Sequence, residues 1–465
     1  MELKLEKLEE VKKDYLSKDV YTIARHALSG QKISALSKKM EQTEFTRNHF
    51  SIDLKTLPVA DQKQSGRCWI FAGCNVLREK VAKKYKLDSF ELSQNYISFY
   101  DKLEKCNYFL DSIIKLKDAP KGDRTRDFIL QNGIEDGGQW DMFVNIVSKY
   151  GVVPKAAFPE TFQSSNTAGI NMILNRYVRK FASEIEKLSS REEIENLQKE
   201  YMHQIYRCLC SAFGVPPTKF SFEYESKQDD KKKTEKTKSH DGLQEEEKSE
   251  ENGKKYSIVK DITPKEFLEK FVGVDLKDYV SIINSPTEDK PFHHTYTVKF
   301  LGNVVEGSPV KYLNLEMDRF KEIVINQLKD KEPVWFGSDC GQGADWDDGV
   351  WDDETFDRDL LFQMDTELSK AEMLDTRDSA MNHAMVITGV NLDASNGDKP
   401  TKWKIENSWG EKVAHKGYYV ASDSWFDKFV FQAVVDKKYL SPEELKEWEE
   451  EPAELEPWDP MGTLA

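Results

Sequence analysis

The chain has 465 residues, a formal net charge of −16, and 38% hydrophobic and 11% aromatic residues. This length accommodates two or three domains or subdomains, with enough apolar material for a large core. An acidic chain lacks the electrostatic attraction that dominates nucleic-acid affinity and is not drawn to anionic lipid, so nucleic acid and membranes are not the expected partners.

The first third of the chain is predicted to be helical. Residues 1–54 are rich in charged side chains, and their apolar residues recur at helix-like spacing. They are expected to form an N-terminal helical extension. A helix start at Ser65-Gly66 opens a helix-compatible run that reaches residue 81, and a second amphipathic segment over residues 140–147 ends at Gly151. We therefore predict a helical subdomain over residues 55–160.

The middle of the chain, residues 161–295, is predicted to be a helical insert, with a long helical stretch from Glu184 to Leu209. Within it, residues 226–256 contain nine Lys and nine Asp or Glu and almost no apolar side chain. Such a segment cannot bury enough apolar surface to offset the entropy of ordering, so a solvated, disordered loop is expected. A role for this loop as a binding tail stays open.

Beyond residue 295 the pattern changes to short alternating runs, which are typical of strands, at residues 294–300, 333–337, 384–388 and 403–406. They predict a β-rich subdomain over residues 296–448. The acidic, proline-containing segment 449–457 is expected to be extended and to lead into the terminal residues 458–465. The expected fold class is α+β.

Three features favour a cytoplasmic location. The first residues, Met1 to Glu6, lack the apolar segment of a secretory signal. No run of about 18 apolar residues predicts a transmembrane helix. The six cysteines are few and scattered, which is typical of reduced thiols rather than of a disulfide framework.

Cys68 stands at the predicted helix start, within the segment 62–69. There it lies at the positive end of the helix dipole, which, with a nearby imidazolium, is expected to lower its pKa and populate the thiolate. Gln62 is placed so that its amide N–H, together with the Cys68 backbone N–H, can donate to a developing oxyanion. A lone cysteine at a helix start is more often structural, so these neighbours carry the hypothesis.

A base for this thiol has to come from a distant part of the sequence. His383 opens an apolar strand, and Asn407 follows in the segment 406–410. An Asn carbonyl can accept from one imidazole nitrogen and leave the other facing the thiol, while Trp409 covers that bond. A histidine at a strand end is ordinarily structural, but the order Cys, His, Asn with these flanks predicts nucleophilic catalysis by a thiol.

With these residues in place, the sequence resembles the bleomycin hydrolase/aminopeptidase C family of papain-like cysteine peptidases. The matching segments span nearly the whole chain: residues 62–72, 136–154, 382–389, 401–410, 415–418 and 458–465. The resemblance implies that Cys68 is the nucleophile, His383 the base, Asn407 the orienting residue and Gln62 the oxyanion donor.

The resemblance also implies four substrate contacts. Gly137 and Gly138 would pair with the substrate backbone, because a side chain there would block its approach. Trp409 would line the cleft. The arm at residues 449–465 would lie in the same cleft, with the Ala465 carboxylate facing the free α-ammonium of the substrate.

The implied fold is a papain-like pair of subdomains, helical and β-barrel-like, with an inserted helical hook domain and the C-terminal arm. His383 follows Cys68 by 315 residues, far more than the ~130–150 usual for these groups, and the insert accounts for the excess. Two positions depart from secreted papain-like enzymes, which have a disulfide where Ser65 and Glu135 stand here. The loss of both cysteines agrees with a reducing compartment.

The implied activity is removal of N-terminal residues from short peptides and related amides through an acyl-enzyme. Bleomycin and homocysteine thiolactone are further implied substrates, and the implied assembly is a homohexamer. Neither a cofactor nor a metal is expected.

Two other interpretations stay open at this point. The first is a nucleic-acid-binding protein with residual peptidase chemistry, which the net charge of −16 disfavours. The second is an inactive scaffold, which the complete set of candidate residues disfavours. Three motifs give weak signals: the acidic run 345–354 lacks EF-hand spacing, Gly341-Gln342-Gly343 is too short to hold phosphate, and Cys208-Leu209-Cys210 has no partner motif for zinc.

Overall fold

The computed structural model describes residues 1–39, 47–227, 245–251 and 254–464. A helical half contains the elements α4 (Cys68–Tyr85), α5 (Gln94–Lys115), α6 (Arg124–Asn132), α7 (Trp140–Tyr150), α8 (Phe162–Ser165), α9 (Ala168–Ile185) and α10 (Arg191–Phe213). The helix predicted from Ser65-Gly66 to residue 81 and the one predicted over residues 140–147 are confirmed as α4 and α7. The single stretch predicted from Glu184 to Leu209 is two helices, because Ser190 caps the start of α10 in a capping box with Glu193.

Strands from both ends of the chain join in one large sheet with the order β15-β6-β7-β5-β14-β8-β11-β12-β13-β10-β9, and β1 pairs with β11. Its strands are β1 (Ile52–Asp53), β5 (Tyr279–Ile283), β6 (Thr295–Val298), β7 (Tyr312–Asn314), β8 (Val334–Ser338), β9 (Ala344–Asp345), β10 (Val350–Trp351), β11 (His383–Asp393), β12 (Lys399–Glu406), β13 (Tyr418–Ser422), β14 (Val430–Asp436) and β15 (Ala453–Leu455). The four predicted strand runs are confirmed as β6, β8, β11 and β12. The architecture is therefore mixed α+β.

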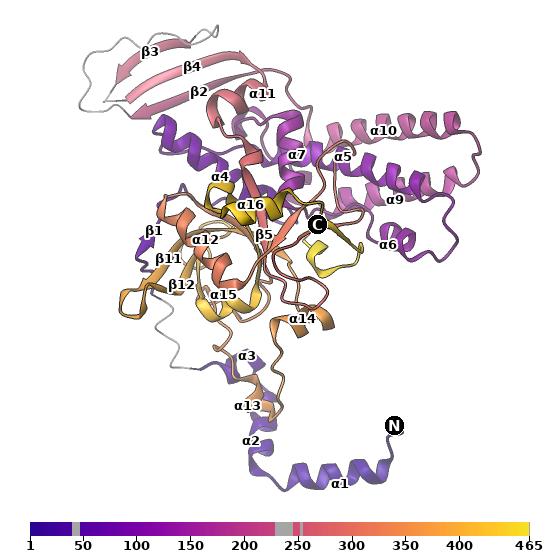
Figure 1. Ribbon diagram of the computed structural model, residues 1–465, viewed down its shortest axis with the longest axis vertical. Coiled ribbons are helices and arrows are strands. Elements are labelled where there is room, and N and C mark those ends of the chain that lie inside the picture. The colour runs from indigo at the N-terminus through magenta and orange to yellow at the C-terminus, as the bar shows by residue number, and fades with distance from the viewer. Residues whose placement is uncertain (40–46, 228–244, 252–253, 465) are drawn as a thin grey trace.

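Helices also accompany this sheet: α12 (Met317–Lys329), α13 (Arg358–Phe362), α14 (Lys370–Thr376), α15 (Asp423–Phe429) and α16 (Pro442–Glu449). In Figure 1, α12 and α15 lie over the sheet, while α13 lies beside the N-terminal helices. Among the described helices, none is long and apolar enough to cross a membrane.

The insert differs from its prediction in two ways. A separate three-stranded sheet, β2-β4-β3, follows α10, with β2 (Phe220–Lys227), β4 (Lys254–Ile262) and β3 (Glu245–Glu251). Part of the charged segment 226–256 is thus strand rather than irregular loop, because the buried apolar residues Phe222 and Val259 anchor β2 and β4, and backbone pairing adds β3. Residues 228–244 and 252–253 lie outside the described residues.

The second difference concerns β5, which falls inside the predicted insert 161–295 but pairs with β14 and β7 of the large sheet. All five of its residues are buried, and a strand buried on both faces reads as a continuous apolar run without the alternation that marks a half-exposed strand. The chain therefore returns to the large sheet earlier than predicted.

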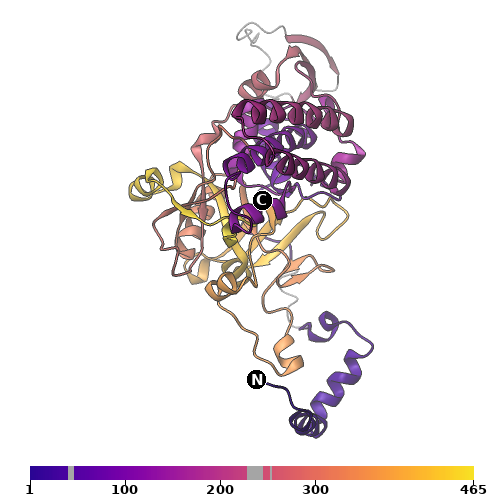
Figure 2. The same cartoon turned by 90° about the vertical axis from the view of Figure 1, so that its right-hand side faces the viewer.

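The N-terminal extension stands away from the body of the molecule (Figures 1 and 2). It contains α1 (Leu5–Leu16), α2 (Asp19–Leu28) and α3 (Ile33–Ser37), so the predicted helical character is confirmed for these elements. Residues 40–46 lie outside the described residues. Residues 52–53, assigned to the extension from sequence, pair with β11 as strand β1.

Helix α4 packs between the other helices of the helical half and the large sheet, and this contact positions the site. Residues of α4 from Cys68 to Leu77 are all buried, and the Trp335 indole on β8 donates to the Trp69 carbonyl at 3.2 Å. Met461 and Leu464 from the C-terminal arm belong to the same buried apolar cluster. One core therefore joins α4, the central strands and the end of the chain.

Candidate active site

The first residue of α4 and the first residue of β11 meet at this contact. The Cys68 side chain is 4% exposed, and its Sγ accepts a hydrogen bond from the Ala384 backbone N–H at 3.4 Å. His383, which precedes Ala384 on β11, is also buried. The packing of α4 on β11 thus places the thiol against the backbone of the residue next to His383, which is 315 residues away in sequence.

Asn407 follows directly after β12, the strand that pairs with β11. Its Oδ1 lies 2.8 Å from His383 Nε2 and also accepts the Ser408 backbone N–H at 2.7 Å. Because Oδ1 is an acceptor only, Nε2 carries the proton in the neutral ring, which leaves Nδ1 as the nitrogen free to take a proton. The Trp409 indole stacks on the imidazole with 4.9 Å between ring centroids.

Gln62 is buried beside these groups. Its Oε1 accepts from the Ser408 hydroxyl, and its Nε2 donates to the Ser65 carbonyl at 2.5 Å. Its backbone N–H donates to the Ser408 carbonyl at 2.8 Å. An amide nitrogen has two protons, so one N–H of Nε2 remains for another acceptor.

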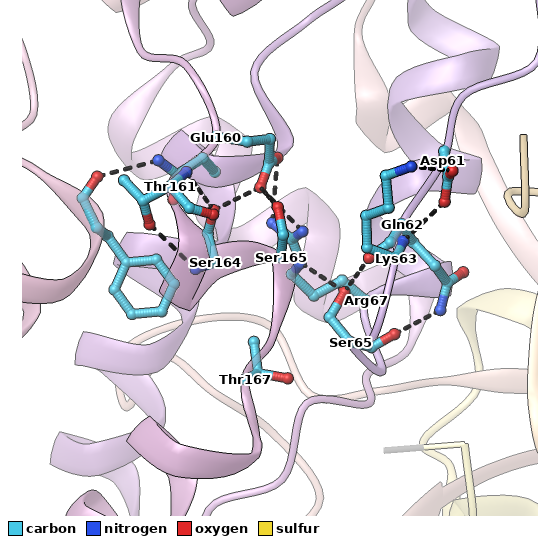
Figure 3. Close-up of polar contacts among 12 residues, drawn as sticks. Asp61, Gln62, Lys63, Ser65, Arg67, Glu160, Thr161, Ser164, Ser165 and Thr167 are labelled. Atoms are coloured by element: carbon cyan, nitrogen blue, oxygen red, sulfur yellow. Dashed lines mark hydrogen bonds and ion pairs between the residues drawn. The ribbon is translucent and has the colours of Figure 1, made fainter.

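The loop that leads to Cys68 is fixed by a buried ion pair (Figure 3). Arg67, only 1% exposed, reaches Glu160 through two hydrogen bonds of 3.2 and 3.0 Å. Its Nε donates to the Ser65 hydroxyl at 2.9 Å, and that hydroxyl donates to the Gln62 carbonyl at 2.6 Å. A bidentate guanidinium–carboxylate pair fixes orientation as well as distance, so this loop is held without a covalent link.

The glycine pair lies against Trp69, the residue after Cys68. A Cβ on Gly138 would come within 2.5 Å of the Trp69 ring, so no larger residue fits there. Asp136, just before the pair, accepts from the Gly66 backbone N–H at 2.9 Å, and its own carbonyl accepts from the Trp69 indole at 2.7 Å. The loop before Cys68 and the loop that contains the glycine pair are therefore joined by hydrogen bonds. These bonds lie next to Ser65 and Glu135, the two positions where the cysteines of the disulfide are missing.

Two buried lysines on α5 donate hydrogen bonds to the loop that contains the glycine pair. Lys102 donates to the Asp136 carboxylate, and Lys105 donates to the Gly137 carbonyl and pairs with Asp101 at 3.1 Å. The Lys102 ammonium holds the pKa of Asp136 well below its usual range despite the burial of that carboxyl. These cations hold the carbonyls of the loop in place.

The C-terminal arm ends against the glycine pair. The Gly138 N–H donates to the Leu464 carbonyl at 3.0 Å, and the Thr463 hydroxyl donates to the Met381 carbonyl at 2.8 Å. Residue 464 is buried. Ala465, predicted to face the substrate, lies outside the described residues.

Further contacts anchor the arm along its length. Asp459 forms a buried ion pair with Lys290 at 3.1 Å, and the Arg124 guanidinium lies 3.7 Å from the centroid of the Trp458 ring. Strand β15 pairs in parallel with β6, which confirms the extended conformation predicted for this part of the arm. The arm thus packs as an ordered element of the fold.

Burial controls the protonation of the two central groups. It raises the pKa of the Cys68 thiol to about 11, although backbone N–H groups, that of Ala384 above all, act in the opposite direction. It lowers the pKa of His383 to about 4, and the hydrogen bond with Asn407 offsets only part of this. The lowered thiol pKa predicted from the helix start is therefore wrong in direction, because removal from water outweighs the helix terminus. At neutral pH the imidazole is neutral and ready to accept a proton.

This shift predicts the acid limb of the pH profile. His383, the base that the resemblance implies, must be unprotonated to accept a proton. A lowered pKa keeps the imidazole unprotonated to a lower pH, so kcat/KM should fall only near pH 4 rather than near the ordinary histidine value of ~6.5. The α-ammonium of a peptide substrate titrates near ~7.7–8.0, so it does not affect this limb. A stopped assay between pH 3 and 7 measures it, and a midpoint near 6.5 would contradict the burial argument.

Sequence patterns did not predict several residues that hold the loops of the site in place. Arg67, Glu160, Lys102 and Lys105 act through buried charge pairs, and a lysine on a helix is ordinarily taken as solvent-facing. The spacing of Lys102 and Lys105 gives no separate signal, since three-residue spacing is common on exposed faces. Within the described ranges, no group of three or more His, Cys, Asp or Glu residues is arranged to hold a metal ion.

This chain is similar to known proteins over most or all of its length. A model of the Peptidase C1-like family matches residues 2–246 and 244–462. Aminopeptidase C of Lactobacillus delbrueckii subsp. lactis is 44% identical, with 100% of this chain and 99% of that protein covered. Bleomycin hydrolase of Homo sapiens is 37% identical, with 88% and 86% covered. The crystal structure of PepW from Lactobacillus rhamnosis matches with a TM-score of 0.91 at 44% identity, covering 100% and 99%. The resemblance drawn from the motifs is confirmed.

Proposed function

The chain belongs to the Peptidase C1-like family and is a cysteine-type aminopeptidase of the aminopeptidase C/bleomycin hydrolase type, and from this premise we propose how its residues perform the reaction. The substrates are short peptides and related amides with a free N-terminus. Cys68 is the nucleophile, His383 the base, Asn407 the orienting residue and Gln62 an oxyanion donor.

The reaction begins when Nδ1 of His383 takes the Cys68 proton as Sγ attacks the carbonyl carbon of the first peptide bond. The Cys68 backbone N–H and the second N–H of Gln62 Nε2 stabilise the resulting oxyanion. The imidazolium then gives its proton to the leaving amine, so the C–N bond breaks and a thioester remains. Water, deprotonated by the same imidazole, hydrolyses the thioester and restores the thiol.

One observation supports removal of single residues rather than internal cleavage. The Leu464 carbonyl accepts the Gly138 N–H, a backbone group that would otherwise pair with a substrate residue. A peptide with further residues before the scissile bond would therefore collide with the arm. Gly137 and Gly138 would pair with the substrate backbone only up to this point, and Ala465 would lie beside the free α-ammonium.

The substrate range includes amides that present a small, unblocked aminoacyl group. The relative named Bleomycin hydrolase suggests the amide of that glycopeptide as one substrate. Homocysteine thiolactone, which has a free amine and an activated acyl group, is a second candidate substrate. The peptidase is proposed to work in the cytoplasm, because its cysteines are free thiols and its loops near Cys68 are held by ion pairs rather than a disulfide.

The N-terminal extension supports assembly into a homohexamer. Its helices α1 and α2 bury no residue, although they present exposed apolar side chains at Leu5, Leu8, Val11, Val20 and Ile23. Exposed apolar side chains that recur along two helices in this way support an interaction surface. Other copies of the chain would cover it, and the arm-lined sites would face a common interior.

Two substrates that differ only at the N-terminus test this function. The purified protein is expected to hydrolyse an alanyl fluorogenic amide and to leave the N-acetylated amide essentially intact. Iodoacetamide should abolish the activity as Cys68 becomes labelled, because His383 takes the proton of this thiol as the sulfur attacks, and peptide mapping should follow the label on Cys68. Equal cleavage of the two amides would contradict the aminopeptidase, and full activity after complete labelling of Cys68 would contradict the thiol mechanism.

A further inference from the structure

Trp346 is the most informative exposed aromatic residue of the described chain, because it lies next to the site without being buried by it. Its side chain is 48% exposed, and its ring centroid lies 5.5 Å from that of Trp409. Trp409 in turn stacks on the His383 imidazole at 4.9 Å.

The loop that presents Trp346 is well fixed. It joins β9 to β10, which pair with each other, and the Gly349 N–H donates to the Asp345 carbonyl at 2.9 Å. The Asp345 carboxylate is buried and pairs with Lys38 at 2.5 Å. The rings of Trp351 and Tyr419 stand edge-on to Trp346 at 6.1 and 6.5 Å, so its indole is held on one side and open on the other.

The arm determines which part of a substrate can reach this ring. Leu464 occupies the backbone site at Gly138, so the N-terminal residue of a substrate lies on that side of Cys68. The leaving portion must then extend past His383, which protonates it, toward Trp409 and Trp346. This direction rests on the function proposed above.

We propose that Trp346 and Trp409 form an aromatic platform that binds the leaving portion of the substrate, so that Trp346 determines specificity for aromatic and other planar apolar groups there. The Trp409 ring centroid lies 4.9 Å from that of His383, and the Trp346 centroid lies 5.5 Å from that of Trp409. These distances determine how far the platform lies from the scissile bond. An extended chain advances ~3.3–3.6 Å per residue, so the platform meets the second or third residue after the scissile bond. The enzyme is therefore expected to prefer substrates with an aromatic side chain on the second or third residue after the scissile bond.

Four substrates with an N-terminal alanine test the platform. Two contain only glycine after it, alanyl-glycyl-glycinamide and alanyl-glycyl-glycyl-glycinamide. In the other two, phenylalanine is the second or third residue after the scissile bond, alanyl-glycyl-phenylalaninamide and alanyl-glycyl-glycyl-phenylalaninamide. Replacing Trp346 by alanine is expected to lower kcat/KM for at least one phenylalanine-containing substrate about 2- to 10-fold, the range of an aromatic pair. The glycine substrates should be unaffected. Trp346→Phe should retain most of the preference, because it keeps a ring at the platform.

Tyr206→Ala is the matched control, because Tyr206 is 42% exposed and lies on α10, away from the site (Figure 1). It should leave all four kcat/KM values unchanged. An equal loss on the glycine and phenylalanine substrates, or no loss on any, would overturn the platform. Activity of Cys68→Ala equal to the unmodified enzyme would instead overturn the proposed function, so the two failures are distinguishable.

Discussion

Cys68→Ala is expected to reduce kcat on the order of 10⁴-fold or more while the protein keeps its fold. The substitution removes the only atom that can form the thioester, and oxyanion stabilisation and substrate binding alone cannot replace it. Cys68→Ser should be nearly as inactive, because a hydroxyl is far harder to deprotonate than a thiol. The measurement is a progress curve on an alanyl fluorogenic amide, with circular dichroism as the check on folding.

Variants of the neighbouring residues distinguish their roles. His383→Ala should be about as inactive as Cys68→Ala, and the double variant should be no worse than either, because groups that act as a unit are not additive. Gln62→Ala should lower kcat roughly 10²–10³-fold if its amide supplies an oxyanion donor. Asn407→Ala should be milder than His383→Ala, because Asn407 transfers no proton.

Cys208→Ala provides the matched control, since this free thiol on α10 is only partly buried and lies outside the site. It should retain full activity. Additive losses in the Cys68→Ala/His383→Ala double variant, or unchanged kcat in Gln62→Ala, would contradict the roles assigned here.

Local patterns were sufficient to predict the elements that carry the site. The run after Gly66 has helical spacing, and α4 begins at Cys68 as expected. The apolar run after His383 predicts a buried strand, and β11 begins at His383. These patterns could be recognised because the spacing of apolar residues indicates which face of a helix or strand packs against the core.

Other features depend on partners that are distant in sequence, and no local pattern reports them. The charged segment near residue 250 forms strands through backbone pairing, which is largely independent of side-chain polarity. Lys102 and Lys105 are buried only because Asp136, Asp101 and the glycine-loop carbonyls surround their ammonium groups. The raised pKa of Cys68 likewise follows from burial by the assembled fold, whereas the helix start on which the sequence argument relied is local.

Removing residues 461–465 is expected to convert the enzyme from an aminopeptidase into an endopeptidase. The deletion frees the Gly138 N–H that the Leu464 carbonyl now occupies, so a longer peptide can continue past Cys68 on that side. In the full chain such a peptide would have to displace the buried side chains of Met461 and Leu464, at ~1.5–3 kcal/mol each. Cleavage of N-acetylated peptides should therefore rise on the order of 10²-fold or more on truncation.

The truncated protein should still fold, because Asp459 keeps its ion pair with Lys290 and Trp458 keeps its contact with Arg124. Leu464→Ala is the matched control, since it loses one of the two buried side chains but leaves the backbone of the arm against Gly138. It should keep the preference for free N-termini while losing part of the thermal stability that the truncation loses. The ratio of kcat/KM for free and acetylated peptides, measured for both variants, is the deciding quantity. If the truncated enzyme keeps the ratio of the full chain, the arm only packs against the cleft, and another group excludes longer substrates.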